Sequence, residues 1–383
     1  MILLETVQRY ISYVFERRQV SIQRKSWLAQ TLHYSEDQWR QLEEMQSSRE
    51  QVEMFQKLRL FFDDSRAIPM ALCQAFHSVD SHFLNETASN IVRYCSEQQQ
   101  QQHNGHHIVN NGHGSNQLVM QNNHQQVSIP KEYLTGSCAL VAYFYRNRMY
   151  VANAGDCRCI LARKVRSNLS SSSLSQPSPQ NSDGVGSGSG ITMSREPLEA
   201  IQCSRDHKAS DPVEQERLRR QFPNEDDIVH NGRVKGKLQP TRAFGDIAFK
   251  HELSSQWMST NYRSWNPPYV TVDPEITQFS LDPSLGIEFV VLATDGLFDF
   301  LSNQQVVDII QEYFLQHSSI PVRPTQLGNV CDILITNILQ MAMARYCNSN
   351  DEFARLQTAL NLSPERRRKF FDDVSVTVIF LSK

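Results

Sequence analysis

An apolar run that ends in two aspartates constrains the fold of this chain more than any other feature. Residues 287–294 read IEFVVLAT and are followed by DGLFD, which places Asp295 and Asp299 directly after the run. A short apolar run rich in β-branched residues is typical of a buried strand. The glycine after Asp295 allows backbone or ligand to approach closely. Ser302 and Gln305 form a capping-box pattern, which predicts a helix there. Both aspartates therefore lie where a buried strand turns into a helix.

Three further acidic turns or strand ends accompany this one: Gly155-Asp156, Gly245-Asp246 and Asp372-Asp373. Taken singly, each aspartate is an ordinary turn former or helix cap. Taken together, Asp156, Asp295, Asp299 and Asp372 indicate a set of carboxylate ligands. Oxygen ligands suit Mg²⁺ or Mn²⁺ better than zinc. Two such ions can turn a bridging water into a hydroxide and stabilise its attack on phosphorus.

The composition excludes several classes of function. The chain has 383 residues, of which 40% are hydrophobic, so it can bury one large core or two modest ones. Its net charge of −3 gives no reason to expect nucleic acid or an anionic membrane as the main partner. No apolar run approaches the roughly 20 residues that span a bilayer. The eight cysteines lack the paired spacing of a zinc site, which favours a reduced compartment.

Residues 1 to about 96 are predicted to be helical. Glu5 interrupts the first apolar stretch and no small-residue cleavage site follows, so the pattern is not that of a secretory signal or a transit peptide. One apolar stripe within residues 3–17 is typical of a helix that packs in a core. A second stripe, starting near Pro69, predicts another helix. Its members are Leu72, Phe76, Val79 and Phe83.

Two low-complexity segments are predicted to be disordered surface loops of a single domain that spans residues 1–383. Residues 97–127 are rich in Gln, Asn and His, and residues 167–190 are rich in Ser and Gly. Metal binding by the histidines of the first segment is the weaker alternative, because a flexible run offers no preorganised ligand geometry.

The remaining segments predict mixed strands and helices. Residues 136–145 and 149–156 are apolar and β-prone around the polar turn at residues 146–148, which indicates a hairpin. Asp211-Pro212-Val213-Glu214 is a typical helix start. The strands and helices do not alternate in a βαβ rhythm, so the pattern predicts an α+β fold in which helices pack outside antiparallel sheets.

Several of these segments also match a known family. The stretches VANAGDCR (151–158), SRDHKASDPVEQERL (204–218), QPTRAFGD (239–246), ATDGLFDF (293–300) and DDVSVTV (372–378), together with Gly136-Ser137, resemble the metal-dependent serine/threonine protein phosphatases of type 2C. The resemblance covers about residues 70–383. It implies a central antiparallel β-sandwich flanked by helices on both sides, and hydrolysis of phosphoserine or phosphothreonine on protein.

The resemblance also implies roles for individual residues. Asp295 and Asp372 would be ligands of a two-metal centre of Mg²⁺ or Mn²⁺, and Asp156, Asp295 and Asp299 would hold a third, more weakly bound ion. Asp206 is expected in a turn or cap, and His207 as a hydrogen-bonded structural histidine. Arg242 belongs to a motif nearer the scaffold. Asp246 either supports a metal ligand or belongs to that scaffold.

The first motifs of the family have no counterpart in this sequence. These are a strand with an acidic metal ligand, a basic residue that binds the substrate phosphate, and an Asp-Gly-His-Gly type loop. No catalytic residue is therefore assigned. We expect an N-terminally truncated domain that lacks its first strands and is a poor catalyst alone. The alternative is a non-catalytic binding module.

Two stretches indicate a branch of the family. RAFGDIAFK (242–250) and NPPYVTVDPEITQFSL (266–281) are most similar to the mitochondrial pyruvate dehydrogenase phosphatases. This resemblance implies the pyruvate dehydrogenase complex as substrate and partner, and the mitochondrial matrix as location, although the sequence has no recognisable presequence.

Overall fold

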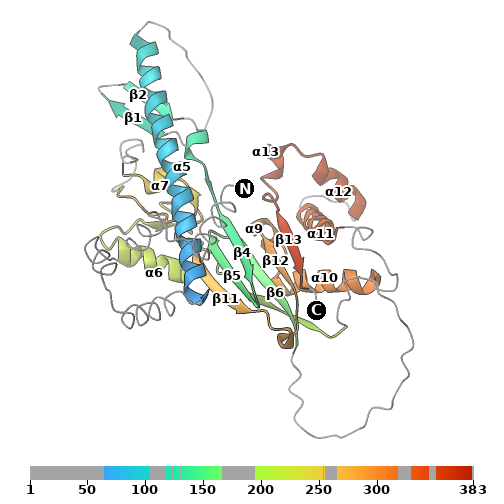
Figure 1. The fold of residues 1–383 in the computed structure, drawn as a ribbon. Coiled ribbons are helices and arrows are strands. Elements are labelled where there is room, and N and C mark those ends of the chain that lie inside the picture. Colours follow the sequence, from blue (N-terminus) through green and yellow to red (C-terminus); the bar gives the residue numbers. More distant parts are fainter. Residues whose placement is uncertain are drawn as a thin grey trace, which may run out of the picture. The chain divides into compact units, whose positions relative to one another are not determined.

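The computed structural model describes nine segments of the chain, and its helices and strands are shown in Figure 1. The described residues are 64–103, 118–122, 125–129, 131–165, 195–252, 254, 265–317, 329–344 and 351–381. They belong to two compact units. The first unit comprises residues 1–137 and 208–276, and the second comprises residues 138–207 and 277–383. The helix predicted within residues 3–17 and the loop predicted at residues 167–190 lie outside the described residues, and the prediction of one domain stays a prediction.

The second unit contains two antiparallel sheets that pack as a sandwich. One sheet has the order β11-β5-β4 and the other the order β13-β12-β6-β7. The first sheet consists of β4 (Ala139–Tyr145), β5 (Arg148–Ala154) and β11 (Glu275–Ser280), which enters this unit at Thr277. The second consists of β6 (Arg158–Lys164), β7 (Leu198–Gln202), β12 (Ile287–Ala293) and β13 (Val376–Phe380).

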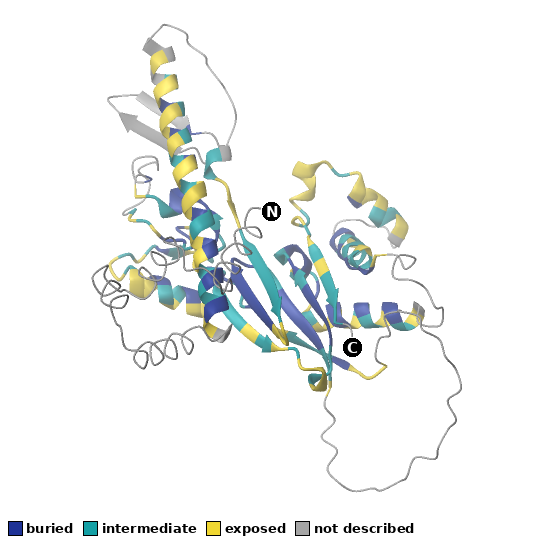
Figure 2. Ribbon diagram, in the orientation of Figure 1, coloured by how far each residue is buried: buried dark blue, intermediate teal, exposed yellow. Residues whose placement is uncertain are grey.

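Strand alternation explains how the four-stranded sheet is buried on both faces. On β6, Cys159 and Leu161 share a cluster with Met149 and Val151 of the other sheet. The intervening residues Ile160 and Ala162 belong to a second cluster, which contains helix side chains. Successive side chains of a strand point to opposite faces, so one run of apolar residues serves both layers. Figure 2 shows the two inner strands, β6 and β12, largely as buried ribbon, whereas the outer strands β7 and β13 are mostly intermediate.

Helices cover the second face of this sheet. These are α10 (Asn303–His317) and α11 (Val330–Ala344), which place Val306, Ile310 and Leu334 against the sheet residues Phe289 and Val291. The short helices α12 (Glu352–Leu360) and α13 (Pro364–Arg367) follow. The prediction of an α+β fold with antiparallel sheets is confirmed.

The first unit is built around α5 (Asp64–His103), and the predicted stripe on this helix needs correction. The helix begins five residues before Pro69, which lies inside it. Phe83 is 40% exposed and does not lie in the core. Its ring covers Gly245 instead, where an added Cβ would lie 2.8 Å from the ring. The buried position near this end of the stripe is taken by Asp80, which is 4% exposed.

The segment predicted as a disordered insertion, residues 97–127, overlaps a helix end and a hairpin in the structure, and its disorder stays a prediction. Helix α5 continues to His103, and β1 (Leu118–Asn122) pairs antiparallel with β2 (Gln125–Ile129). Glutamine favours helix, and apolar residues on both strands favour a hairpin. Ile129 is buried in the core cluster that contains Ile91 and Cys95 of α5. Residues 104–117 and 123–124 lie outside the described residues.

A buried ion pair joins α6 (Pro212–Gln221) to the loop that follows Gln239. Asp211 caps the helix as predicted and accepts hydrogen bonds from the amides of Val213 and Glu214 at 2.8 and 3.2 Å. The carboxylate of Glu214 is fully buried. It accepts hydrogen bonds from Thr241 at 2.6 Å, Arg242 at 2.7 Å and Arg217 at 3.0 Å.

Short elements complete the first unit. They are η1 (Lys131–Leu134), β3 (Gly136–Ser137), β8 (Val229–His230), β9 (Arg233–Val234), β10 (Phe244–Gly245) and α7 (Ile247–Lys250). Across the described parts of both units, none of the helices combines the length and apolarity that crossing a bilayer requires.

Candidate metal centre

The strand register of the second unit brings three of the predicted aspartates to one end of the four-stranded sheet. Asp156 precedes β6, Asp295 follows β12 and Asp372 precedes β13. Ala293, the last residue of β12, pairs with Arg158 of β6 and with Val376 of β13. Because β12 lies between β13 and β6 and runs antiparallel to both, its end lies beside the starts of these two strands.

The turn after β12 is held against the segment that contains Asp372. The Thr294 amide donates to the Ser375 carbonyl at 3.0 Å, and the Thr294 hydroxyl donates to the Asp373 carbonyl at 3.1 Å. A Cβ on Gly296 would lie 2.8 Å from the Asp373 carbonyl oxygen and 3.3 Å from that of Asp372. Only glycine allows this approach without a shift, which agrees with the close approach predicted from the Asp-Gly pair.

Asp299 lies one helical turn after Asp295. The helix α9 (Asp295–Phe298) is short, and the Asp299 amide donates to the Asp295 carbonyl at 2.8 Å. Residues separated by four positions on a helix lie on the same face. The two carboxylates therefore start from the same side of α9.

The turn that carries Asp156 is held from several sides. Asp156 is 7% exposed, and its carboxylate accepts a hydrogen bond from the Cys138 thiol at 3.1 Å. The buried Asn153 amide donates to the carbonyls of Gly155, Cys157 and Arg205 at 2.8–3.0 Å. Such a network fixes the backbone on both sides of Asp156.

The charges of Asp156 and Asp295 act on the same thiol. The pKa of Cys157 is raised to about 12, first by burial and then by the negative charges of Asp156, Asp295 and Asp206. Burial, followed by the charge of Asp156, also raises the pKa of Cys138. Both thiols are therefore protonated at neutral pH.

The four predicted ligands are all carboxylates and are carried by segments at the same end of the sheet, which suits a hard divalent cation. Carboxylates with all-oxygen coordination are the ligands that Mg²⁺ and Mn²⁺ prefer. Within the described segments, however, no three His, Cys, Asp or Glu side chains lie close enough together to hold a metal ion as they stand. Asp372 is exposed, and its carboxylate accepts the amide of Asp373 at 2.8 Å. Metal ligation by these four aspartates thus stays a prediction.

Asp206 and His207 belong to a loop that packs against the Asp156 turn. Asp206 forms a two-pronged ion pair with Arg158, with N–O distances of 3.0 and 2.6 Å. His207 is fully buried, and its Nδ1 accepts a hydrogen bond from the Gly155 amide at 3.3 Å.

Arg242 and Asp246 belong to the first unit. Arg242 pairs with Glu214 and donates to the Asp273 carbonyl at 3.1 Å. Asp246 is 7% exposed, and its pKa is raised to about 7 because burial and the charge of Asp80 outweigh the opposing effect of Lys250. Asp80 in turn pairs with Lys250 at 2.7 Å and accepts the Gly245 amide at 2.8 Å.

Sequence reasoning missed Arg158, Asn153 and Asp80. Arg158 and Asn153 flank Asp156 in VANAGDCR, so their proximity to a candidate ligand was the available signal. Asp80 lies next to Val79 of the predicted apolar stripe. A carboxylate beside a buried helix stripe indicates a buried partner, although the sequence does not name Lys250 as that partner.

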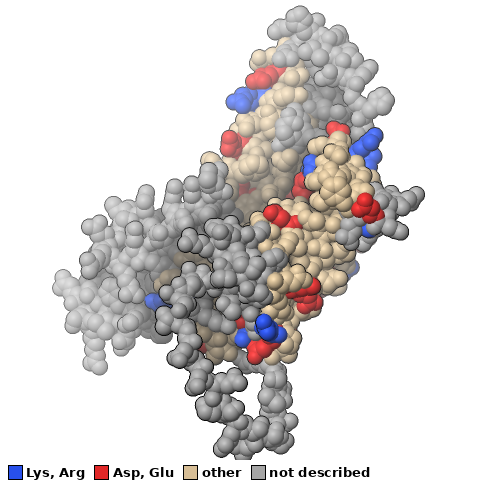
Figure 3. Space-filling view, turned by 90° about the vertical axis from the view of Figure 1, so that its right-hand side faces the viewer, with Lys and Arg blue, Asp and Glu red and all other residues tan. Residues whose placement is uncertain are grey.

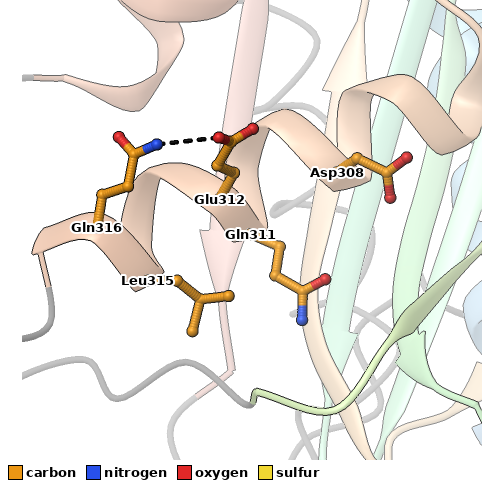
Figure 4. Close-up of a pocket in the computed structure, with 5 residues that line it drawn as sticks. All are labelled: Asp308, Gln311, Glu312, Leu315 and Gln316. Atoms are coloured by element: carbon orange, nitrogen blue, oxygen red, sulfur yellow. Dashed lines mark hydrogen bonds between the residues drawn. The ribbon is translucent and has the colours of Figure 1, made fainter.

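A surface hollow of about 470 Å³ lies on α10 (Figure 4). Its lining residues, Asp308, Gln311, Glu312, Leu315 and Gln316, all come from that helix. Two of the lining amides are already bonded: Gln316 donates to Glu312 at 2.9 Å and Gln311 donates to the Glu196 carbonyl at 2.7 Å. On the face shown in Figure 3, acidic and basic side chains are interspersed. We assign no ligand to this hollow.

Comparisons with known proteins identify the family. The sequence profile of "Protein phosphatase 2C" matches residues 40–181 and 187–350. Human "[Pyruvate dehydrogenase [acetyl-transferring]]-phosphatase 2, mitochondrial" is 28% identical over 284 residues, which cover 65% of this chain and 48% of that protein. "Probable protein phosphatase 2C 40" of Arabidopsis thaliana is 30% identical over 249 residues, which cover 64% of this chain and 42% of that protein.

The chain spans about half the length of these curated relatives. Among solved structures, the serine-threonine phosphatase 2C from Toxoplasma gondii is similar with a TM-score of 0.40 and 15% identity. That alignment covers 93% of this chain and 79% of the other. Because the family profile matches most of the sequence, this chain belongs to the protein phosphatase 2C family of metal-dependent serine/threonine phosphatases.

Proposed function

We propose that this chain takes part in the metal-dependent hydrolysis of phosphoserine and phosphothreonine on proteins. The observation that carries the proposal is the register of β6, β12 and β13, which places Asp156, Asp295 and Asp372 at one end of a sheet. Membership of the protein phosphatase 2C family supports it. Bound Mg²⁺ or Mn²⁺ would supply an activated water and would stabilise negative charge on the phosphoryl group.

In this proposal the four aspartates bind the ions as two overlapping groups of ligands. Asp295 and Asp372 would hold the main pair, and Asp156, Asp295 and Asp299 would hold a third ion. Residues around them keep these carboxylates in place. Gly296 lets the turn after β12 lie against the Asp372 segment, and the Asn153 amide holds the turn around Asp156. Four other residues of the family motifs have a structural role and do not bind the ions: Asp206, His207, Arg242 and Asp246.

We further propose the phosphorylated pyruvate dehydrogenase complex as the substrate and the mitochondrial matrix as the location. The support is that two kinds of mitochondrial "[Pyruvate dehydrogenase [acetyl-transferring]]-phosphatase" are 28–29% identical to this chain. Plant protein phosphatases 2C are similar to the same degree. If the proposal is correct, the protein releases phosphate from phosphorylated pyruvate dehydrogenase faster than from phosphocasein. Equal rates on both substrates would remove this assignment.

A second candidate is a binding module without turnover. The observation that favours it is that no three ligand side chains within the described residues form a metal cage as they stand. In this function the sandwich would bind a phosphoprotein and leave the phosphate in place.

Titration with Mn²⁺ separates the two candidates. We expect calorimetry to detect Mn²⁺ binding by the 383-residue chain. Asp295→Asn should weaken the binding by roughly tenfold or more, because ligand charge sets affinity at oxygen-only sites. Asp308→Asn, an exposed aspartate on α10, should bind Mn²⁺ like the parent chain. Phosphate release from a phosphoserine peptide should follow the same order.

Two outcomes would contradict the proposed phosphatase activity or its site. If the chain binds no Mn²⁺ and releases no phosphate, yet retains phosphopeptide in a pull-down, it acts as a binding module. If Asp308→Asn and Asp295→Asn weaken the binding equally, the measured ions are not held at the end of the sheet.

A further inference from the structure

The side chain of Arg158 joins segments of the second unit that lie far apart in the sequence. Its Nε and Nη2 bind the two carboxylate oxygens of Asp206 at 3.0 and 2.6 Å. Its Nη1 donates to the side-chain oxygen of Asn303, at the start of α10, at 2.8 Å. The guanidinium group also lies 4.5 Å from the ring centre of Phe298. All of these contacts form within one compact unit.

The contact with Phe298 matters because of the position of that ring. Phe298 ends α9, between Asp295 and Asp299. A guanidinium group above an aromatic face is attracted by the ring and packs flat against it. Arg158 itself is two residues after Asp156. One side chain therefore connects the backbone that carries Asp156 with the short helix that carries two other candidate ligands.

The loop around Asp206 completes this connection. The Arg205 carbonyl accepts the Asn153 amide at 2.8 Å, and the Ser204 hydroxyl accepts the Cys159 amide at 2.9 Å. The loop and the Asp156 turn are thus bound to each other by hydrogen bonds between side chains and backbone. Arg158 forms an ion pair with Asp206 through two of its nitrogens and packs on the ring of Phe298. It thereby holds α9 against the Asp206 loop and the Asp156 turn.

We propose that Arg158 is a positioning residue that sets how closely Asp295 and Asp299 approach Asp156, and thereby the affinity for a divalent cation. This inference rests on the proposed function. Asp156 and Asp295 repel each other when no cation lies between them. A rigid contact that keeps α9 in place opposes this repulsion. Lysine cannot replace arginine here, because it has neither the two-pronged geometry nor the flat surface.

The test compares Mn²⁺ affinity with folding stability in matched variants. Arg158→Lys and Phe298→Leu should each weaken Mn²⁺ binding about tenfold in calorimetric titrations, the loss typical of residues that orient metal ligands. Arg163→Lys is the control, because Arg163 lies on the same strand and its Nε and Nη2 bind Glu199 at 2.9 and 2.6 Å.

Thermal unfolding without metal shows whether each variant folds. We expect Arg158→Lys and Arg163→Lys to unfold at similar temperatures, while only Arg158→Lys loses Mn²⁺ affinity. If Arg158→Lys and Phe298→Leu bind Mn²⁺ as the parent chain does, while Asp295→Asn binds it weakly, this inference is wrong and the proposed function stands. If the parent chain binds no Mn²⁺, both are wrong.

Discussion

Replacing Glu214 with alanine is expected to destabilise the protein by about 3 kcal/mol, because removal of one partner from a buried ion pair leaves the other charge uncompensated. The Glu214 carboxylate is fully buried and bonds to Thr241, Arg242 and Arg217. Arg242 is 14% exposed and would remain in place without its counter-charge. Urea unfolding followed by circular dichroism measures the change in the free energy of unfolding.

Glu216 offers a matched control on the same helix. It pairs with Arg220 at 2.7 Å, but these side chains are 49% and 78% exposed. An exposed pair one helical turn apart contributes about 0.3–0.5 kcal/mol, so Glu216→Ala should change little. Equal losses in the two variants would show that burial of the Glu214 cluster does not stabilise the fold.

The same cluster predicts a pH dependence. Burial opposes ionisation of Glu214, but the hydrogen bonds and charge of Arg242, with the Thr241 hydroxyl, outweigh it and lower the pKa from 4.5 to about 2. A carboxyl with a lowered pKa in the folded state stabilises that state above its unfolded pKa. This stabilisation is therefore complete above about pH 4.5 and is lost as the pH falls to about 2. In Glu214→Gln, the free energy of unfolding should fall less over this interval.

Replacing Gly155 with alanine is expected to destabilise the second unit by about 3 kcal/mol, the combined cost of backbone strain and overpacking. The backbone of Gly155 has φ of 128°, a conformation that residues with a side chain rarely adopt. An added Cβ would lie 2.3 Å from the Cys138 sulfur and 3.0 Å from the Cys138 Cα. Relief of this clash would move the strand start beside Asp156. Thermal unfolding and Mn²⁺ titration should both register the change.

Gly232 separates the effect of conformation from that of crowding. It also has a positive φ, of 69°, but the nearest atom to an added Cβ lies 3.6 Å away. Gly232→Ala should therefore cost about 1 kcal/mol, the strain of the left-handed conformation alone. If Gly155→Ala is no more harmful than Gly232→Ala, the contact between Gly155 and Cys138 is looser than the structure indicates.

The strands and the helix start that were predicted correctly are those that depend on residues close together in the sequence. The apolar run at residues 287–294 became β12, and Asp211 caps α6, because strand burial and capping depend on near neighbours in the sequence. Asp156, Asp295 and Asp372 were grouped as candidate ligands because each lies at a strand end or turn. The resemblance to a family added the roles of the individual residues to that grouping.

What the sequence could not predict depends on contacts between distant residues. Arg158 bonds to Asp206, which is 48 positions away, and to Asn303, which is 145 positions away. Asp80 meets Lys250 across 170 positions. Buried charges are paired, but many different pairings satisfy this rule. A local sequence pattern therefore does not predict which two residues form a given pair. The hairpin of residues 118–122 and 125–129 was not predicted, because polar composition was given more weight than the apolar residues within the segment.

The pairing of β12 has a consequence for how the protein is made. Residue 293 pairs with residue 158 on one side and with residue 376 on the other. Such long-range pairing is slow to form, since a large loop of chain must close before the contacts are gained. During synthesis, β6 and β12 can meet before β13 has left the ribosome, but the end of the sheet that bears the carboxylates stays open on one side until then. Nascent chains that stall shortly before residue 376 therefore carry an exposed strand edge, and they should depend on chaperones to remain soluble.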